Sequence, residues 1–384
     1  MLSCCVCLTV LALAVPLQAA AARTQVAIIN TVPFHHEVYP AFTHAWERAG
    51  FEVSAFVNGG ADFGMADVTT SWGFKFSNLS SFPHNFCKFK VIIFTSVEYG
   101  RDYHMASRVV QSGCRHQQRY VFVVHNPRAL RDSRRGPSKL LGLVTSQANI
   151  YVVGLSPHTT AAMTKIFQDN GHDRTVDYII PLFPVDSSPM RVTHSGFVLQ
   201  GSISDRRRNY KKLIEDVVGS PASWTPDFKL VVLGKGNVSI PKEAKSLVKL
   251  QPNSLYPEYY STIQQSYGLL TAFASKIYFR EKASSTVAAS LICGTPLLTE
   301  PETIKVYSYL SESSVWLRKR RESDVEAMHR ILSDPDLEDE FSKRASSLGE
   351  DIERAHVYNT VTIDKIMSAL LSSIVPEGKG IERK

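Results

Sequence analysis

The residues whose types and spacing best suit chemistry lie in one stretch near the end of the chain, EKASSTVAASLICGTPLLTE, at residues 281–300. Its Ser-Ser-Thr run precedes an apolar segment and predicts the start of a helix. A helix start presents unpaired backbone N–H groups and the positive end of a dipole. Together with the hydroxyls of Ser284, Ser285 and Thr286 and the ammonium group of Lys282, these donors would suit a diphosphate.

A simpler interpretation of this stretch is that Ser284 only caps the helix and that Lys282 is solvated, which is the better explanation for any such helix taken alone. Its surroundings favour a ligand. Glu281 stands directly in front of the lysine, and a Cys-Gly-Thr-Pro turn leads into an apolar strand, all near the end of a strand-helix series. We therefore predict a phosphate-binding helix start here.

A second candidate is the basic segment at residues 206–212, which follows the strand-like GFVLQGS. Gly201 lies at the end of that strand, and Arg208 or Lys212 could neutralise the charge of a departing diphosphate. The alternative is a basic surface that only contacts solvent. Because a glycine-led strand end stands just before it, we predict that this segment contacts a ligand.

Histidines follow two of the predicted strands. His125 ends an apolar strand and precedes Asn126-Pro127, a pair that forces a turn, so its ring could contact a substrate hydroxyl in a cleft. A structural histidine satisfied by the backbone is an equal alternative. His35 and His36 lie in the loop after the first strand and could border an acceptor site.

Missing motifs argue against several classes of protein. Neither half has G-x-G-x-x-G after its first strand, where NTVPFHH and GSISDRRR stand instead, which argues against a dinucleotide oxidoreductase. Beyond the apolar N-terminal segment there is no C-x-x-C and no H-E-x-x-H, so we predict no metal site. No nucleic-acid-binding motif occurs, and we expect no nucleic-acid partner.

The elements that must position these residues form two series in which strands alternate with helices. The first series has strands at 25–30, 51–57, 89–97, 119–126, 149–156 and 176–185, and helices at 41–50, 104–113 and 157–171. The second has strands at 196–202, 228–236, 246–252 and 267–273, and helices at 208–218, 258–266, 324–332 and 337–371. Short apolar strands between helices indicate parallel sheets covered on both faces. The predicted fold class is therefore α/β, with two Rossmann-like domains facing across a cleft.

The composition divides the chain into four parts. Residues 1–22 carry no charged side chain and end in small residues, which predicts a cleaved secretory signal peptide, with an uncleaved membrane anchor as the alternative. The segment PLFPVDSSPM separates a first Rossmann-like (acceptor) domain, residues 23–186, from a second (donor) domain, residues 187–355. Residues 356–384 form a C-terminal helix and a basic tail. The predicted location is the lumen of the ER or Golgi, or outside the cell.

Charge and cysteine content fit this route. The net charge of +7 lies in a few basic segments, which suits phosphate-bearing ligands and weak contact with an anionic membrane surface. Cys87 and Cys114 could form a disulfide in an oxidising compartment. Asn78-Leu79-Ser80 and Asn237-Val238-Ser239 are sequons for N-glycosylation, so a glycoprotein is expected if the chain enters the ER.

Several segments of the second half resemble one family. ASLICGTPLLTE resembles the EAMACGTPVI segment of GT-B glycosyltransferases, especially the retaining glycosyltransferase family 4. GSISDRRRNYKKLIEDV is similar to that family's glycine-led loop, Lys-Asn pair and following helix. VVLGKGN, which contains Gly234, resembles its L-x-G-x-G strand end. The resemblance covers residues 196–310, and only VVHN and GLSPHTTAAM are similar in the first half.

This resemblance implies a donor site and also marks where the chain departs from the family. The family has two glutamates eight positions apart, of which the first touches the donor sugar and the second the ribose. The first corresponds to Glu281, whereas Ala289 stands at the second position. The family's lysine corresponds to Arg208, and Ser202 stands where a loop arginine is expected. A metal-independent reaction that retains the anomeric configuration is also implied.

We therefore expect an enzyme that moves a sugar from a nucleotide-diphosphate sugar, its co-substrate, to a glycan, protein or lipid acceptor, without a further cofactor. Lys282, the helix start and Arg208 would stabilise charge on the diphosphate, and Glu281 charge on the sugar. Two alternatives stay open. A secreted two-lobe binding protein, or a degenerate GT-B protein, would bind without transfer, and a sugar-nucleotide epimerase would release an isomerised sugar.

Overall fold

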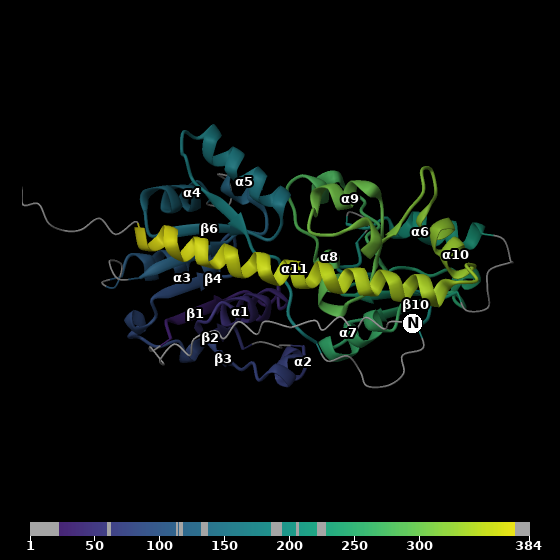
Figure 1. Cartoon of the computed structure of the whole chain (residues 1–384), viewed down its shortest axis with the longest axis horizontal. Coiled ribbons are helices and arrows are strands. Elements are labelled where there is room, and N and C mark those ends of the chain that lie inside the picture. Colours follow the sequence, from purple (N-terminus) through teal and green to yellow (C-terminus); the bar gives the residue numbers. More distant parts are fainter. Residues whose placement is uncertain are drawn as a thin grey trace, which may run out of the picture.

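The fold consists of two parallel β-sheets with helices on both faces of each sheet (Figure 1). The computed structural model describes residues 23–59, 63–112, 114, 118–131, 137–185, 194–204, 207–220 and 228–372. The predicted signal peptide, residues 186–193, which include the second half of the predicted linker PLFPVDSSPM, and the basic tail after residue 372 lie outside the described residues.

The first sheet has seven strands in the order β3-β2-β1-β4-β5-β6-β7, and every neighbouring pair is parallel. The central strands are runs of branched and aromatic residues that are buried on both faces, as a covered parallel sheet requires. Its strands are β1 (Gln25–Asn30), β2 (Glu52–Val57), β3 (Phe76–Asn78), β4 (Val91–Phe94), β5 (Arg119–Val123), β6 (Ile150–Gly154) and β7 (Val176–Tyr178). Its helices are α1 (Val38–Arg48), α2 (Met65–Thr69), α3 (Gly100–Val110), α4 (Pro137–Ser146) and α5 (Pro157–Asp169).

The second sheet has six strands in the order β10-β9-β8-β11-β12-β13, again all parallel. Its strands are β8 (Phe197–Gln200), β9 (Leu230–Gly234), β10 (Val248–Pro252), β11 (Gly268–Leu270), β12 (Leu297–Thr299) and β13 (Trp316–Leu317). Its helices are α6 (Tyr210–Gly219), α7 (Tyr256–Gln264), α8 (Ser285–Cys293), α9 (Pro301–Val306), α10 (Asp324–Leu332) and α11 (Leu337–Ser372). The predicted α/β class with two Rossmann-like domains is confirmed.

Each sheet has one point at which the strand order reverses. In the first sheet it lies between β1 and β4, and in the second between β8 and β11. Connections from neighbouring strands leave such a point in opposite directions, so a crevice opens beyond the carboxyl ends of the strands. The loops that follow β1 and β8 both contribute to the site described below.

The two halves are also joined by the last helix, which runs along both of them (Figure 1). The Asn359 side chain of α11 accepts a hydrogen bond from the Ile180 amide and donates one to the Ile180 carbonyl, each 2.9 Å long. Near the end of α11, the Arg119 Nε donates to the Leu370 carbonyl at 2.6 Å. The predicted C-terminal helix does pack against the first half, and it continues without a break through residues 355 and 356, where the sequence analysis places a domain limit.

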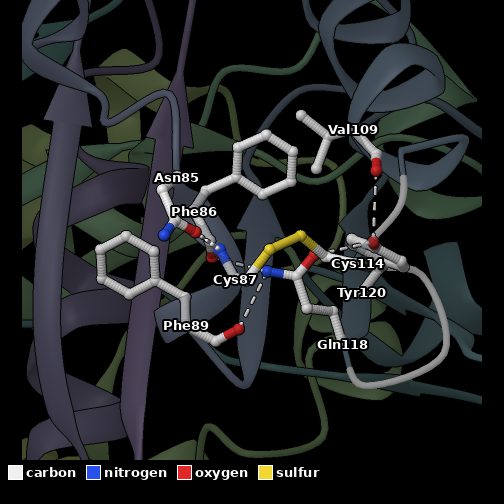
Figure 2. Close-up of a disulfide and its surroundings, with 8 residues drawn as sticks. All are labelled: Asn85, Phe86, Cys87, Phe89, Val109, Cys114, Gln118 and Tyr120. Carbon is white, nitrogen blue, oxygen red and sulfur yellow. Dashed lines mark hydrogen bonds between the residues drawn. A yellow bond between two sulfur atoms is a disulfide. The ribbon is translucent and has the colours of Figure 1, made fainter.

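A disulfide joins Cys87, just before β4, to Cys114, between α3 and β5, as the sequence allows (Figure 2). The side chain of Gln118 holds the same region together, because its amide donates to the carbonyls of Phe86 and Phe89 at 2.6 and 3.0 Å. The Tyr120 hydroxyl donates to the Gln118 Oε1 at 3.1 Å.

Among the described helices, none is both long and apolar enough to cross a membrane.

Candidate functional site

Two adjoining cavities lie between the halves, at the carboxyl ends of the strands beside both reversal points. The first, of about 160 Å³, is lined by Arg207, Arg208 and Lys282, and we call it the basic cavity. The second, of about 490 Å³, has seven aromatic side chains among its lining residues, and we call it the aromatic cavity. Six residues line both cavities: His35, Glu37, Gln200, Gly201, Ser202 and Ser285.

Arg208 brings a buried positive charge to the basic cavity. It lies just before α6, is 4% exposed, and places its guanidinium over the rings of Phe273 and Tyr278, 5.0 and 5.2 Å from their centroids. Its Nη2 donates to the Thr286 Oγ1 at 2.7 Å, while its Nε is buried without a hydrogen-bond partner. Burial lowers the pKa of this guanidinium. None of the described carboxylates forms an ion pair with it.

Lys282 and Arg207 add two further cations to the same cavity. Burial, followed by the charges of Arg207 and Arg208, lowers the pKa of the Lys282 ammonium group. Within the described part of the chain, neither Lys282 nor Arg207 pairs with an acid. Arg207 is exposed, but Arg208 is buried and Lys282 half-buried, and buried charges are costly unless a partner neutralises them. The basic cavity is therefore suited to an anion with more than one charge.

The start of α8 faces these cations. Ser284 is the N-cap, and its hydroxyl accepts a hydrogen bond from the Thr286 amide at 3.2 Å. The Ser284 amide donates to the Tyr307 hydroxyl at 3.0 Å, which fixes the helix end. Ser284 and Ser285 line the basic cavity, and Ser285 is exposed within it. The predicted positions of Lys282, Ser284, Ser285 and Arg208 around one space are thus observed.

Thr286 has a different place from the one that the sequence suggests. Its side chain is fully buried and lines neither cavity. Its hydroxyl oxygen accepts hydrogen bonds from Arg208 and, at 2.8 Å, from the Gln200 Nε2. The Thr286 hydroxyl therefore holds the Arg208 guanidinium in place without lining either cavity. The prediction that Thr286 contacts a phosphate is corrected.

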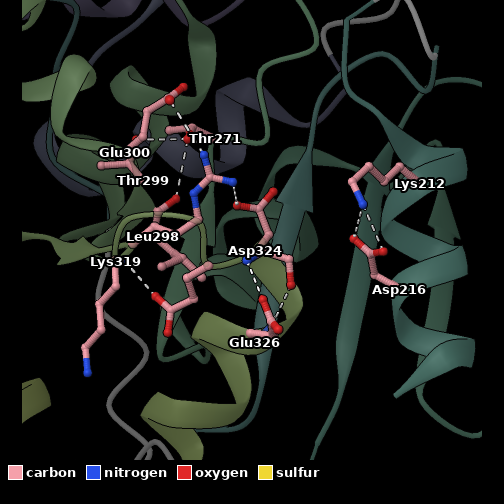
Figure 3. A network of polar contacts seen from close by, with 12 residues as sticks. Lys212, Asp216, Thr271, Leu298, Thr299, Glu300, Lys319, Asp324 and Glu326 are labelled. Atoms are coloured by element: carbon pink, nitrogen blue, oxygen red, sulfur yellow. Dashed lines mark hydrogen bonds and ion pairs between the residues drawn. The ribbon is translucent and has the colours of Figure 1, made fainter.

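Lys212 also lies away from the cleft. Its Nζ donates to both carboxylate oxygens of Asp216, one turn further along α6, at 3.0 Å (Figure 3). Lys212 and Asp216 line a separate cavity with Glu300 and Asp324. Four residues beyond Arg208, the chain has entered α6, and the lysine lies on a face of the helix that is turned from the cleft. The predicted role of Lys212 toward a diphosphate is not supported.

Glu281 forms an ion pair with Arg128 of the first half, so that this contact spans the two halves. The Glu281 side chain is 20% exposed and that of Arg128 is 60% exposed. Glu281 lines neither cavity, although its neighbour Lys282 lines the basic one. The carboxylate is therefore held by Arg128 outside both cavities.

The predicted histidines His35 and His125 come together on the first-half side of the basic cavity. Their rings stack with centroids 3.9 Å apart, and the His125 Nε2 lies 2.6 Å from the Thr95 carbonyl. Because a carbonyl only accepts, the Nε2 carries the proton. Burial lowers the pKa of His125 to about 4 and that of His35 well below its usual value. Both rings are neutral at pH 7 and suit hydroxyl groups, whereas His36 lines the aromatic cavity.

The two predicted strand-end glycines lie against each other. Gly201 and Gly234 have φ angles of 124° and 145°, and a Cβ at Gly234 would stand 1.7 Å from the Gly201 carbonyl oxygen. Only glycine allows this backbone conformation and this close approach. Both glycines line the aromatic cavity, so they open space for a ligand beside the second sheet.

Several residues that line the cavities are not predicted from the sequence: Glu37, Tyr99, Asn126, Gln200, Arg207, Tyr256 and Tyr259. Arg207 falls within the predicted basic segment, and Glu37 directly follows the two predicted histidines, so both carry a weak signal. Gln200 is the last residue of β8 and carries no signal. Over the described residues, no three histidine, cysteine, aspartate or glutamate side chains gather in a way that could hold a metal ion.

No protein-family model matches the chain, and no curated protein matches it in sequence. Solved structures do. HepE from Anabaena, in complex with UDP and glucose, matches with a TM-score of 0.60 and 12% identity over 91% of this chain and 100% of that one. Sucrose-phosphate synthase from Thermosynechococcus elongatus matches with a TM-score of 0.54 and 12% identity over 91% and 100%.

AviGT4, a glycosyltransferase involved in avilamycin A biosynthesis, matches with a TM-score of 0.53 and 13% identity, over 91% of this chain and 98% of that one. At such low identity these likenesses establish the fold. They agree with the two parallel sheets, the reversal points and the cleft described above. The chain therefore has the GT-B fold of the glycosyltransferases, as the resemblance of its second half predicts.

Proposed function

We propose that this protein transfers a sugar from a nucleotide-diphosphate sugar to an acceptor. The observation that carries this proposal is the meeting of Lys282, Arg207 and Arg208, without an acidic partner among the described residues, at the start of α8. A departing diphosphate carries the charge that such a set of groups would neutralise. A solved structure of HepE with UDP-glucose supports a donor of this class.

The two cavities suggest how a donor would be divided between them. The diphosphate would lie on the cations and on Ser284 and Ser285. The sugar would extend toward the neutral rings of His35 and His125, and the nucleoside would occupy the aromatic cavity. Aromatic surfaces with a few polar groups are typical of pockets for organic ligands of this size.

We propose a metal-independent reaction, because fixed cations and the helix dipole would do the work that a divalent ion does elsewhere. Transfer that is unchanged by a chelator would support this part, and a strict need for Mg²⁺ or Mn²⁺ would contradict it. Retention of configuration follows only from the family resemblance. The anomeric configuration of the product, measured by NMR before it equilibrates, tests it directly.

The first experiment is a thermal-shift panel of uridine, adenosine and guanosine diphosphates and their sugars on the purified protein. A ligand that binds the folded state raises the melting temperature by mass action. We expect at least one nucleoside diphosphate to do so, and we expect its sugar to be transferred or slowly hydrolysed. If no member of the panel raises the melting temperature, the proposal is wrong.

A second candidate function is nucleotide-sugar binding without transfer. It is favoured by Glu281, which is held by Arg128, and by Ala289, which brings a methyl group to the position of the family's second glutamate. This candidate predicts a melting-temperature rise with a nucleotide sugar but neither hydrolysis nor transfer. Release of an isomerised sugar in the same assay would instead indicate an epimerase.

A further inference from the structure

The carboxylate of Glu37 lies at the junction between the two cavities. Glu37 lines both cavities, and among the residues that the structure describes no other aspartate or glutamate lines either of them. It stands directly before α1, in the loop after β1, and so belongs to the first half. Its position next to Val38 and across from α7 brings it into a space whose other walls come mostly from the second half.

The Glu37 carboxylate has few interactions with the described part of the protein. Its side chain does not cap α1 and has no ion pair there, and it accepts a hydrogen bond from its own backbone amide. Tyr256 and Tyr259 line the aromatic cavity together with Glu37, and burial, followed by the charge of Glu37, raises the pKa of both phenols. Burial likewise raises the pKa of Glu37. A half-buried carboxylate with two oxygens can accept several hydrogen bonds, and the hydroxyl groups of a ligand in the cavities would supply further donors.

The chemistry of a nucleotide predicts which part of it meets Glu37. If the diphosphate lies on the cations and the base among the tyrosine rings, the ribose that connects them must lie at the junction of the cavities. A carboxylate offers two acceptor oxygens, which match the two hydroxyls of a ribose diol. Gln200, which also lines both cavities, already accepts from Tyr259 and donates to Thr286.

We infer that Glu37 binds the ribose hydroxyls of the donor nucleotide, an inference that rests on the proposed function. The helix that would supply this carboxylate in the family has Ala289 and Ile292 facing the aromatic cavity, and neither can accept a hydrogen bond from a hydroxyl. The Glu37 carboxylate of the first half would thus bind the ribose of a nucleotide whose other parts contact mainly the second half. Nucleotide binding would then draw the two halves together and would discriminate ribonucleotides from deoxyribonucleotides.

The test compares, by calorimetry on the purified protein, each nucleoside diphosphate that binds in the thermal-shift panel with its 2′-deoxy counterpart. We expect the wild type to prefer the ribonucleotide by about tenfold or more, as for hydrogen bonds to a charged group. Glu37→Ala should bind both with the weaker affinity, and Glu37→Gln should keep part of the preference. Glu47→Ala is the matched control, because Glu47 is exposed on the same helix and lines neither cavity.

Three outcomes would overturn the inference. Glu37→Ala could keep the full preference for the ribonucleotide, or it could keep nucleotide affinity while losing sugar transfer, which would place the carboxylate at the sugar. In both cases the proposed function would stand. If the wild type binds no nucleotide at all, the proposed function fails as well, so the two failures are distinguishable. Equal melting temperatures of the variants and the wild type would show that folding is unaffected.

Discussion

Lys282 shows how single residues in the basic cavity favour binding at the expense of stability. Its ammonium group is partly buried near two guanidinium groups, and burial together with these charges lowers its pKa. A side chain held against repulsion in the empty protein is stabilised once an anion enters. Replacing a charged side chain at such a site with an uncharged one is therefore expected to weaken ligand binding without lowering the stability of the fold.

We expect Lys282→Met to keep or raise the melting temperature of the ligand-free protein. The same variant should bind the nucleoside diphosphate about tenfold more weakly or worse, because it loses a charge-assisted hydrogen bond. Thermal unfolding with and without ligand, together with calorimetry, measures both effects. Lys305→Met on α9 is the control, since Lys305 is exposed and lines no part of the cleft. A lower melting temperature with unchanged affinity would make Lys282 a structural residue.

The ion pair of Glu281 with Arg128 makes the proposed role of this glutamate testable. An exposed pair contributes only about 0–1 kcal/mol, so the loss of either partner should change the free energy of unfolding little. If Glu281 acts on the sugar, it must first leave Arg128, and Arg128→Gln frees it to do so.

We therefore expect opposite effects on sugar transfer from the two substitutions. Arg128→Gln should keep or increase the rate, whereas Glu281→Gln should lose most of it and keep its affinity for the nucleoside diphosphate. Initial rates at saturating donor give the comparison. Equal losses in both variants would mean that only the ion pair matters, and an unchanged rate in Glu281→Gln would remove this residue from the site.

At the scale of elements, α1 and α11 meet through a pair of histidines, His44 and His356, whose ring centroids lie 5.1 Å apart. Burial is the main cause that lowers the pKa of each to about 4, and for His44 the charge of His356 adds to it. An unfolded chain binds these protons near pH 6.5. Between pH 6.5 and 4 the unfolded state thus binds more protons than the folded state, so stability falls as the pH falls through this window.

We expect the melting temperature to decrease from pH 7 to pH 5 at constant ionic strength, and to decrease less in the double variant His44→Gln/His356→Gln. Some dependence should persist, because burial also lowers the pKa of His125. Thermal unfolding followed by circular dichroism measures the slopes. His104→Gln, an exposed substitution on α3, is the control. Equal slopes in the double variant and the wild type would show that this pair does not couple folding to pH.

The same scale shows which elements a sequence can predict. The central strands β1, β4, β5 and β6 are continuous apolar runs, and each lies where the sequence places it. The short edge strand β3 and the helix α4 are absent from the sequence analysis. The predicted strand at residues 176–185 is only β7, Val176–Tyr178, because Pro181 and Pro184 cannot donate to a ladder and the chain leaves the sheet there.

The candidate site was predictable where it depends on one local pattern. The helix start at Ser284, with Lys282 before it, follows from neighbouring residue types alone. Lys212 was assigned wrongly because residues close in sequence on a helix lie on different faces. Glu37 could not be found, because its importance comes from meeting the second half across the cleft. A contact between residues so far apart in the sequence produces no periodic pattern of residue types along the chain.

At the scale of the whole molecule, the halves share more than a linker. Ala288 and Ile292 of α8 and Tyr260 of α7 pack into the same apolar cluster as Val38 of α1. The C-terminal part of α11 belongs to this cluster as well. A ligand held between the halves would therefore bind beside an apolar cluster to which both halves already contribute.

The last prediction concerns the compartment in which the whole molecule folds. The disulfide between Cys87 and Cys114 is of a kind that persists in oxidising compartments and is rare in the cytosol. The sequon residues Asn78 and Asn237 are both exposed, so an attached glycan would reach solvent. If the apolar N-terminal segment directs the chain into the ER, as we propose, these features should be modified together.

We expect the protein made in eukaryotic cells with its own N-terminal segment to lose apparent mass on treatment with an N-glycosidase. The shift should shrink in Asn237→Gln, and Cys87 and Cys114 should resist alkylation until a reductant is added. The same chain without residues 1–22 should remain in the cytosol without a glycan and serves as the control. An unglycosylated product with both thiols reactive would contradict entry into the secretory pathway. This result would not depend on the proposed ligand, because neither enzymatic glycosylation nor the disulfide requires it.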